Sequence, residues 1–397
     1  MKAEASNVKA FPGWPEFAQD QIDAAITVLR SGKVNYWTGA EGREFEREYA
    51  GSVGTRHAIA LANGTVSLEL ALAVLDIGPG DEVVTTPRTF IASASCAVMR
   101  GAVPVFADVD LDSQNITAES IERVITPRTR ALILVHLAGW PCEMNRILEL
   151  AAGRRIAVIE DCAQAHGAEY EGRPVGGFGT FGSFSFCQDK IITTGGEGGM
   201  LLTDDEGLWS RAWSFKDHGK SYEAVYRREH APGFRWLHES FGTNWRMTEM
   251  QAAIGRAQLK RLPEWVERRR RNAAGIAAGL SGVEGLRIPQ PPTHIRHSYY
   301  KFYAFLDVTR LRANWTRDRV VAEINARGVP CFSGSCSEIY LERAFLRSEG
   351  SRPGERLANA RALGESSLMF LVHPTLDDSH IARTVDVATD MLRVAMR

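Results

Sequence analysis

The sequence contains little lysine. Only eight of its 47 basic residues are lysine, so arginine supplies the other 39 positive charges. An arginine side chain stays protonated, whereas a lysine amine can lose its proton and act as a nucleophile. Any reaction that needs such an amine therefore has few candidates in this chain. They are Lys2, Lys9, Lys33, Lys190, Lys216, Lys220, Lys260 and Lys301.

Other absences exclude whole classes of protein. None of the six cysteines forms a C-x-x-C pair or has a zinc-site spacing to histidine, so we expect reduced thiols and no metal. No apolar run approaches the ~20 residues of a membrane-spanning helix, and residues 1–5 lack the apolar core of a signal peptide. The formal net charge of -1 argues against a broad surface for nucleic acid or anionic lipid. We therefore expect a cytoplasmic protein without nucleic-acid or membrane partners.

The order of apolar segments predicts an α/β fold. Short apolar strands alternate with helices between residues 57 and 205, a pattern typical of a mostly parallel sheet sandwiched by helices. The predicted strands are 57–62, 81–86, 103–107, 131–136, 156–160, 183–187 and 199–203. The predicted helices among them are 65–75, 90–100, 119–125 and 146–153.

The chain is too long for one ordinary compact domain, at 397 residues. We expect a large domain over residues 1–255 and a smaller α+β domain over residues 256–397, with the first helix packing near the smaller one. The elements that suggest this are a first helix at 16–29, a helical stretch at 247–280 broken or bent near Pro263, an aromatic strand at 299–306, and helices at 316–327 and 379–395.

The candidate chemistry lies at strand ends, because ligands of open α/β sheets bind at the carboxyl ends of the strands. Asp161 directly follows the predicted strand 156–160. A carboxylate there can pair with the ring nitrogen of pyridoxal phosphate, a cofactor that acts as an electron sink only while that nitrogen is protonated. The alternative is that Asp161 only caps the next helix, and this residue alone does not decide between the two.

Lys190 follows the predicted strand 183–187 and precedes a glycine-rich turn at 195–199. A Schiff-base lysine needs an apolar or cationic setting that keeps its amine neutral, and no other lysine of this chain follows a strand in such a context. The alternative is a lysine at a surface turn. The glycines allow close backbone approach and positive φ angles. The run Gly177–Gly182 reads G-x-G-x-x-G, but a strand follows it instead of a helix, which excludes a dinucleotide site.

Two further segments offer contacts for such a cofactor. Gly64 and Thr65 open a helix after the first strand, where free N–H groups and the helix dipole favour a phosphate. Phe90 opens the next helix and can lie flat against a pyridine ring. The alternatives are a simple helix cap and ordinary core packing. His166 and His218 are assigned no role.

In order and spacing, these segments resemble the fold-type-I pyridoxal-phosphate enzymes, and specifically the DegT/StrS family of sugar aminotransferases. The resemblance covers nearly the whole chain. The motifs that carry it are Asn63-Gly64-Thr65, Thr89-Phe90, Glu160-Asp161-Cys162-Ala163-Gln164-Ala165, Phe184-Ser185-Phe186 with Lys190, and most firmly Gly242-Thr243-Asn244-Trp245-Arg246-Met247.

The resemblance implies a bound pyridoxal 5'-phosphate, glutamate as the amino donor, and a homodimer with two shared sites. It implies that Lys190 forms the Schiff base and transfers protons, that Asp161 pairs with the pyridine nitrogen, and that Gln164 lies near the phenolic oxygen. Phe90 would stack on the ring. The phosphate would be held by Gly64, Thr65 and Ser185, and by Asn244 of the partner subunit.

The resemblance leaves the acceptor open. Most members of the family act on nucleotide-linked keto sugars, whereas residues 184–248 are most similar to members that aminate an oxidised 3-deoxy-octulosonate to an 8-amino sugar acid. The loop 330–336 departs from the aromatic, His- and Pro-rich pattern of the family. A role in surface-glycan or secondary-metabolite sugar synthesis follows from either acceptor. A sugar dehydratase and a non-catalytic regulator are the alternatives, and the presence of Lys190 favours amino transfer.

Overall fold

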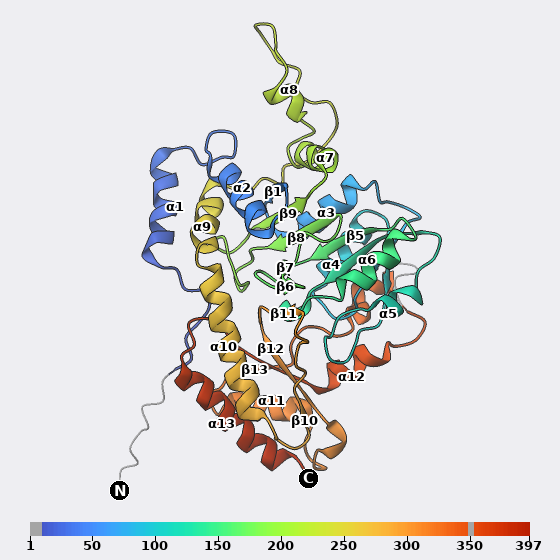
Figure 1. The fold of residues 1–397 in the computed structure, drawn as a ribbon, viewed down its shortest axis with the longest axis vertical. Helices are drawn as coiled ribbons and strands as arrows, with labels where there is room; N and C mark the ends of the chain where they lie inside the picture. The colour runs from blue at the N-terminus through green and yellow to red at the C-terminus, as the bar shows by residue number, and fades with distance from the viewer. Residues whose placement is uncertain (1–9, 348–352) are drawn as a thin grey trace.

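The computed structural model describes residues 10–347 and 353–397. The larger part of the described chain is built on a seven-stranded sheet with the order β1-β9-β8-β5-β4-β2-β3 (Figure 1). Its strands are β1 (His57–Leu61), β2 (Glu82–Thr85), β3 (Val103–Phe106), β4 (Thr129–Val135), β5 (Ala157–Asp161), β8 (Phe181–Ser185) and β9 (Gly199–Thr203). The helices of this part are α1 (Gln19–Ser31), α2 (Glu41–Val53), α3 (Gly64–Val74), α4 (Ala92–Met99), α5 (Ala118–Glu122), α6 (Met144–Ala152), α7 (Glu206–Lys216) and α8 (Tyr222–Tyr226), with the 3₁₀ helix η1 (Leu137–Gly139).

The seven-stranded sheet is mostly parallel. Strands β3, β2, β4, β5 and β8 run parallel to one another, and β9 pairs antiparallel with both β1 and β8. Successive strand residues point to opposite faces, so Val84 belongs to an apolar core that includes residues of α2 and α6, whereas Val83 belongs to one that includes residues of α3, α4 and α7. Helices therefore cover both faces, and the predicted α/β class is confirmed.

All seven predicted strands are present, and their ends agree within two residues. The difference that bears on the site is in β8, which ends at Ser185 instead of residue 187. Beyond it, the N–H of Phe186 donates to the carbonyl of Gly198 at 2.8 Å, and then the chain turns. Lys190 consequently lies in a turn after the strand and not at the strand end.

The C-terminal part contains a four-stranded antiparallel sheet with the order β10-β12-β14-β13. Its elements are α9 (Glu249–Leu259), α10 (Leu262–Leu280), β10 (Leu286–Arg287), β12 (Phe302–Leu306), η2 (Val308–Arg310), α11 (Arg317–Ala326), β13 (Cys331–Phe332), η3 (Ile339–Leu341), η4 (Arg343–Arg347), α12 (Ala358–Ser366), β14 (Ser367–Phe370) and α13 (Asp378–Ala395). Helices α10, α11 and α13 share one apolar core with this sheet. A small three-stranded sheet of β11 (Ile295–Arg296), β6 (Glu169–Tyr170) and β7 (Arg173–Pro174) joins the two parts.

The long helical stretch is divided before Pro263, which occupies the first turn of α10. Proline is well placed there because the first N–H groups of a helix have no partner within the helix. The predicted interruption near Pro263 is therefore confirmed. Helix α9 crosses the predicted boundary between residues 255 and 256, and the division of the chain into domains at that point stays a prediction.

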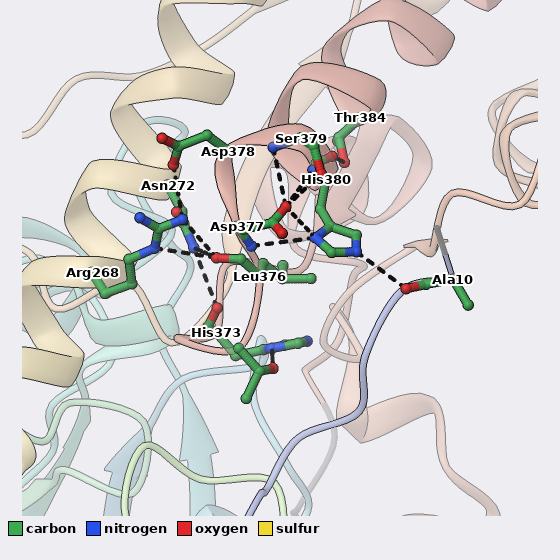
Figure 2. Close-up of polar contacts among 11 residues, drawn as sticks. Ala10, Arg268, Asn272, His373, Leu376, Asp377, Asp378, Ser379, His380 and Thr384 are labelled. Atoms are coloured by element: carbon green, nitrogen blue, oxygen red, sulfur yellow. Dashed lines mark hydrogen bonds and ion pairs between the residues drawn. The ribbon is translucent and has the colours of Figure 1, made fainter. Parts of the chain in front are cut away.

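The segment before α1 lies against the C-terminal part. The ring of Trp14 meets that of Trp265 edge-on at 5.0 Å between centroids, and His380 Nε2 is 3.1 Å from the carbonyl oxygen of Ala10, as Figure 2 shows. Helix α1 itself lies beside α9, where Gln258 Nε2 donates to Gln21 Oε1 at 3.0 Å. Among the described helices, none combines the length and the apolar character that a membrane crossing requires.

Candidate active site

A cavity of about 1230 Å³ lies at the carboxyl ends of β5 and β8. It is bounded on one side by the seven-stranded sheet and its helices, and on the other by residues of the C-terminal part. Seven of the eight predicted site residues line it, namely Gly64, Thr65, Phe90, Asp161, Gln164, Ser185 and Lys190. Residues that are up to 126 positions apart in this set therefore meet at one place.

Asp161 is the last residue of β5, and its carboxylate is buried. Ser93 Oγ donates to Asp161 Oδ2 at 2.7 Å, and the N–H of Ala163 donates to Oδ1 at 3.1 Å. Burial raises the pKa of this carboxyl group, while the two hydrogen bonds oppose the rise. A cationic ring nitrogen beside Asp161 would offset the cost of its burial, because an opposite charge favours the ionised form.

Lys190 lies in the turn that follows β8. Its Nζ is 5.1 Å from the centroid of the Tyr300 ring. The turn is held at two points, since the N–H of Lys190 donates to the carbonyl of Cys187 at 3.1 Å and Trp14 Nε1 donates to the carbonyl of Lys190 at 2.8 Å. The backbone of the turn is thereby held in place, and Lys190 lines the same cavity as Asp161.

The N-terminus of α3 opens onto the cavity beside the end of β8. Asn63 caps this helix by accepting a hydrogen bond from the N–H of Val66 at 3.0 Å. A Cβ atom on Gly64 would lie 2.5 Å from the Cβ of Ser185, so only glycine allows this close approach. The first N–H groups of a helix and a nearby hydroxyl form a suitable donor set for a phosphate.

Phe90 and Gln164 occupy other parts of the cavity wall. The side chain of Phe90 is 67% exposed, so the alternative of ordinary core packing is wrong. The N–H of Ala138 donates to Gln164 Oε1 at 2.8 Å, which orients the amide and leaves its NH₂ group to donate elsewhere. An exposed aromatic face, an amide donor, a carboxylate, an amine and a phosphate cradle fit the groups of pyridoxal phosphate.

The glycine segments have the structural roles that their sequence suggests. Gly195 and Gly196 adopt positive φ angles of 81° and 120° in the turn after Lys190. The G-x-G-x-x-G run binds no nucleotide phosphate, because its backbone N–H groups donate hydrogen bonds to the buried carboxylate of Glu160 instead. The N–H groups of Phe178 and Gly179 donate to Glu160 Oε1 at 2.7 and 2.8 Å.

Asn244 does not line the cavity of its own chain. It is exposed and pairs with Asp217 through an isolated β-bridge, and its contact with a partner's phosphate stays a prediction. His166 is buried between the hydroxyl of Tyr49 at 2.8 Å and the carbonyl of Ser185 at 2.9 Å. Burial lowers the pKa of His166 to about 3, which makes it a neutral structural residue.

The sequence did not indicate several residues of the site. Ser93, which donates to Asp161, lies one helical turn after Phe90 and carries no motif of its own. The C-terminal wall was also missed, apart from the unusual loop 330–336, which does reach the cavity. The wall residues from this part are Tyr300, Lys301, Tyr303, Phe332, Gly334, Ser335, Cys336, Ile339, Glu342, Met369 and Leu371.

A mostly parallel seven-stranded sheet with a lysine, a carboxylate and a helix N-terminus at one cavity defines the class of fold-type-I aminotransferases. Comparison with known proteins places the chain within that class. Residues 15–388 match the model of the DegT/DnrJ/EryC1/StrS aminotransferase family. The chain belongs to this family, whose enzymes depend on pyridoxal phosphate.

Three similar proteins illustrate the relationship. The solved structure of an aminotransferase from Psychrobacter cryohalolentis is 54% identical, with a TM-score of 0.95 over 97% of this chain and 99% of that one. The UDP-N-acetyl-3-dehydro-alpha-D-glucosamine 3-aminotransferase of Acidithiobacillus ferrooxidans is 40% identical over 88% of both chains. The GDP-perosamine synthase of Caulobacter vibrioides is 35% identical over 90% of this chain and 92% of its own.

Proposed function

We propose that this enzyme transfers an amino group from L-glutamate to the keto group of a nucleotide-linked sugar, with pyridoxal 5'-phosphate as cofactor. The observation that carries the proposal is the meeting of Lys190, Asp161 and the N-terminus of α3 in one cavity. The relatives named for sugar amination support the acceptor class. The product would be an amino sugar for a surface glycan or a secondary metabolite.

Different residues of the cavity would bind different parts of the cofactor. Asp161 would face the ring nitrogen, Phe90 the ring, Gln164 the region of the phenolic oxygen, and Gly64, Thr65 and Ser185 the phosphate. When bound, the cofactor supplies an electron sink for the carbon that carries the amino group. Lys190 Nζ would remove the proton from the donor α-carbon and deliver a proton again during the second half-reaction.

The dimer is part of the proposal. The segment that contains α8 projects from the body of the molecule (Figure 1) and ends near Asn244. It carries three strongly exposed aromatic side chains, since Phe234, Trp236 and Phe241 are 79, 81 and 99% exposed. Aromatic side chains are enriched at protein interfaces. A second copy of the chain is therefore the proposed partner, and Asn244 would reach the phosphate in that partner's site.

The second acceptor to test is an oxidised 3-deoxy-octulosonate, which would give an 8-amino sugar acid. The specific observation in its favour is that the loop that departs from the family pattern borders the cavity, with Phe332, Gly334, Ser335 and Cys336 in its wall. Small residues at this position change the contacts available to an acceptor, so the nucleotide-linked sugars of the relatives do not by themselves define the substrate of this chain.

The experiment is an absorbance spectrum of the protein with bound cofactor, recorded before and after excess glutamate. We expect glutamate to convert the cofactor from its aldehyde to its amine form, and a keto sugar to reverse the change. Incubation with nucleotide-linked 3-keto and 4-keto sugars and with the oxidised octulosonate, followed by mass spectrometry, then identifies the acceptor. A bound cofactor that glutamate leaves unchanged would refute the proposed donor, and turnover without any amino donor would indicate a dehydratase.

A further inference from the structure

The cavity holds few positive charges for the anionic substrates it is proposed to bind. Among the described residues that line it, the cationic side chains are Lys190 and Lys301. In the proposed function the amine of Lys190 is engaged by the cofactor, which leaves Lys301. The carboxylates in the same wall are those of Asp161, Asp189, Glu197 and Glu342.

Lys301 lies just before β12 and close to the reacting lysine. Its Nζ is 4.7 Å from the centroid of the Tyr300 ring, the same ring that has Lys190 Nζ at 5.1 Å. Both amines therefore lie against the same ring in one cavity. This position is suited to an anionic group that is attached directly to the reacting carbon.

The ammonium group of Lys301 is only partly compensated. The nearest carboxylate oxygen is Asp189 Oδ2 at 3.8 Å, which is too far for a hydrogen bond. Asp189 also accepts a hydrogen bond from the hydroxyl of Tyr300, so its charge is shared. The side chain of Lys301 is 17% exposed, which means that little water replaces the missing partner.

The groups around Lys301 are mostly cationic or neutral. Burial lowers the pKa of Lys301 to about 8, and the charges of Arg269 and Lys190 act in the same direction against Asp189. Arg269 is buried behind Tyr300 and donates to its carbonyl at 3.1 Å. At Lys301 an incoming carboxylate would thus meet a cation whose charge Asp189 offsets only in part.

We propose that Lys301 binds the α-carboxylate of the amino donor. The inference rests on the proposed aminotransferase function. The α-carboxylate is bonded to the carbon from which Lys190 removes a proton, so both lysines have to face the same few atoms. The charged groups of the acceptors are attached farther from the reacting carbon, whether they are the diphosphate of a nucleotide-linked sugar or the carboxylate of an octulosonate aminated at its other end. The contact of both lysines with the Tyr300 ring therefore favours the donor.

The test compares two ligands that differ by one carboxylate. α-Methyl-L-glutamate has no proton on its α-carbon and cannot react further, and 4-aminobutyrate is glutamate without its α-carboxylate. Their dissociation constants are measured calorimetrically on the cofactor-bound dimer of the wild type, Lys301→Met, Lys301→Arg and Lys260→Met. Lys260 is an exposed lysine between α9 and α10, so its substitution removes the same charge at a distance.

For Lys301→Met we expect α-methyl-L-glutamate to bind roughly tenfold to hundredfold more weakly, the contribution of one charge-assisted hydrogen bond. Binding of 4-aminobutyrate should change less than about threefold on the same reasoning, and both Lys301→Arg and Lys260→Met should resemble the wild type. Unchanged binding of both ligands would overturn the inference. An equal loss for both would also overturn it, because the shared amine or γ-carboxylate would then be the group that Lys301 contacts.

A measurement on the wild type gives the same answer if Lys301→Met fails to fold. Since Lys301 binds a carboxylate only in its protonated form, the preference for α-methyl-L-glutamate over 4-aminobutyrate should decline as the pH rises through about 8. Burial and the charges of Asp189, Arg269 and Lys190 set this value, and Tyr300 and His373 are the other titratable groups that face the amine. A preference that stays constant to pH values well above 8 would refute the inference. Failure of glutamate to convert the wild-type cofactor would instead refute the proposed function itself.

Discussion

Replacement of Asp161 by asparagine tests the central feature of the site. The wild-type carboxylate is buried, 6% exposed, and holds two donors, Ser93 Oγ at 2.7 Å and the N–H of Ala163 at 3.1 Å. Asparagine preserves the size of the side chain but removes the charge that keeps a ring nitrogen protonated. A neighbouring carboxylate shifts such a pKa by ~1–3 units, or ~1.4–4 kcal/mol. We therefore expect the half-reaction with glutamate to slow by roughly tenfold to thousandfold.

The assay is the single-turnover rate of cofactor conversion by saturating glutamate, measured by absorbance. Ser93→Ala gives a graded comparison, because it keeps the carboxylate and removes one hydrogen bond, worth ~0.5–1.5 kcal/mol. Asp76→Asn removes a carboxylate that is 76% exposed and paired with Arg211, and it should leave the rate unchanged. If Asp161→Asn binds the cofactor and reacts within about threefold of the wild-type rate, Asp161 does not keep the ring nitrogen of the cofactor protonated.

Three further substitutions test the rest of the proposal. Lys190→Ala should remove the covalent attachment of the cofactor and slow the half-reaction by about 10²–10⁴-fold, the range for a lost acid–base group, as followed by absorbance and mass spectrometry. Gly64→Ala places a Cβ 2.5 Å from that of Ser185 and should weaken cofactor binding by about tenfold or more in equilibrium dialysis, whereas Gly51→Ala, with no atom within 4 Å, should not. Trp236→Ser exchanges an 81% exposed indole and should shift sedimentation towards the monomer, and an unchanged dimer would contradict the interface proposed for this segment.

The central sheet could be predicted from the sequence because its signal is local. Each strand is a short apolar run bounded by turn residues, and this pattern does not depend on the rest of the chain. The predicted end of β8 was two residues too late. Phe186 still donates one hydrogen bond to Gly198, but the chain then turns and the strand pairing stops. Strand ends depend on the partner strand, which the sequence of one segment does not specify.

The cofactor side of the site was predictable for a related reason. Asp161 and Ser185 end strands of one parallel sheet, and Gly64 begins the helix that follows another strand, so the topology brings them together. The opposite wall depends on how the four-stranded sheet packs against the seven-stranded one. Nothing in the sequence around Lys301 indicates that it shares the Tyr300 ring with Lys190, because this arrangement depends on how two separate cores pack together.

The exposed aromatic side chains of the projecting segment support the proposed dimer. The projecting segment exposes the side chains of Phe234 and Trp236. Asn244, which follows them in the chain, does not line the cavity of its own chain. A monomer would leave these aromatic side chains in water, at a cost of ~25 cal/mol per Å². In the proposed dimer this segment would contact a second copy of the chain, which would remove its aromatic side chains from water, and Asn244 would act in the partner's site.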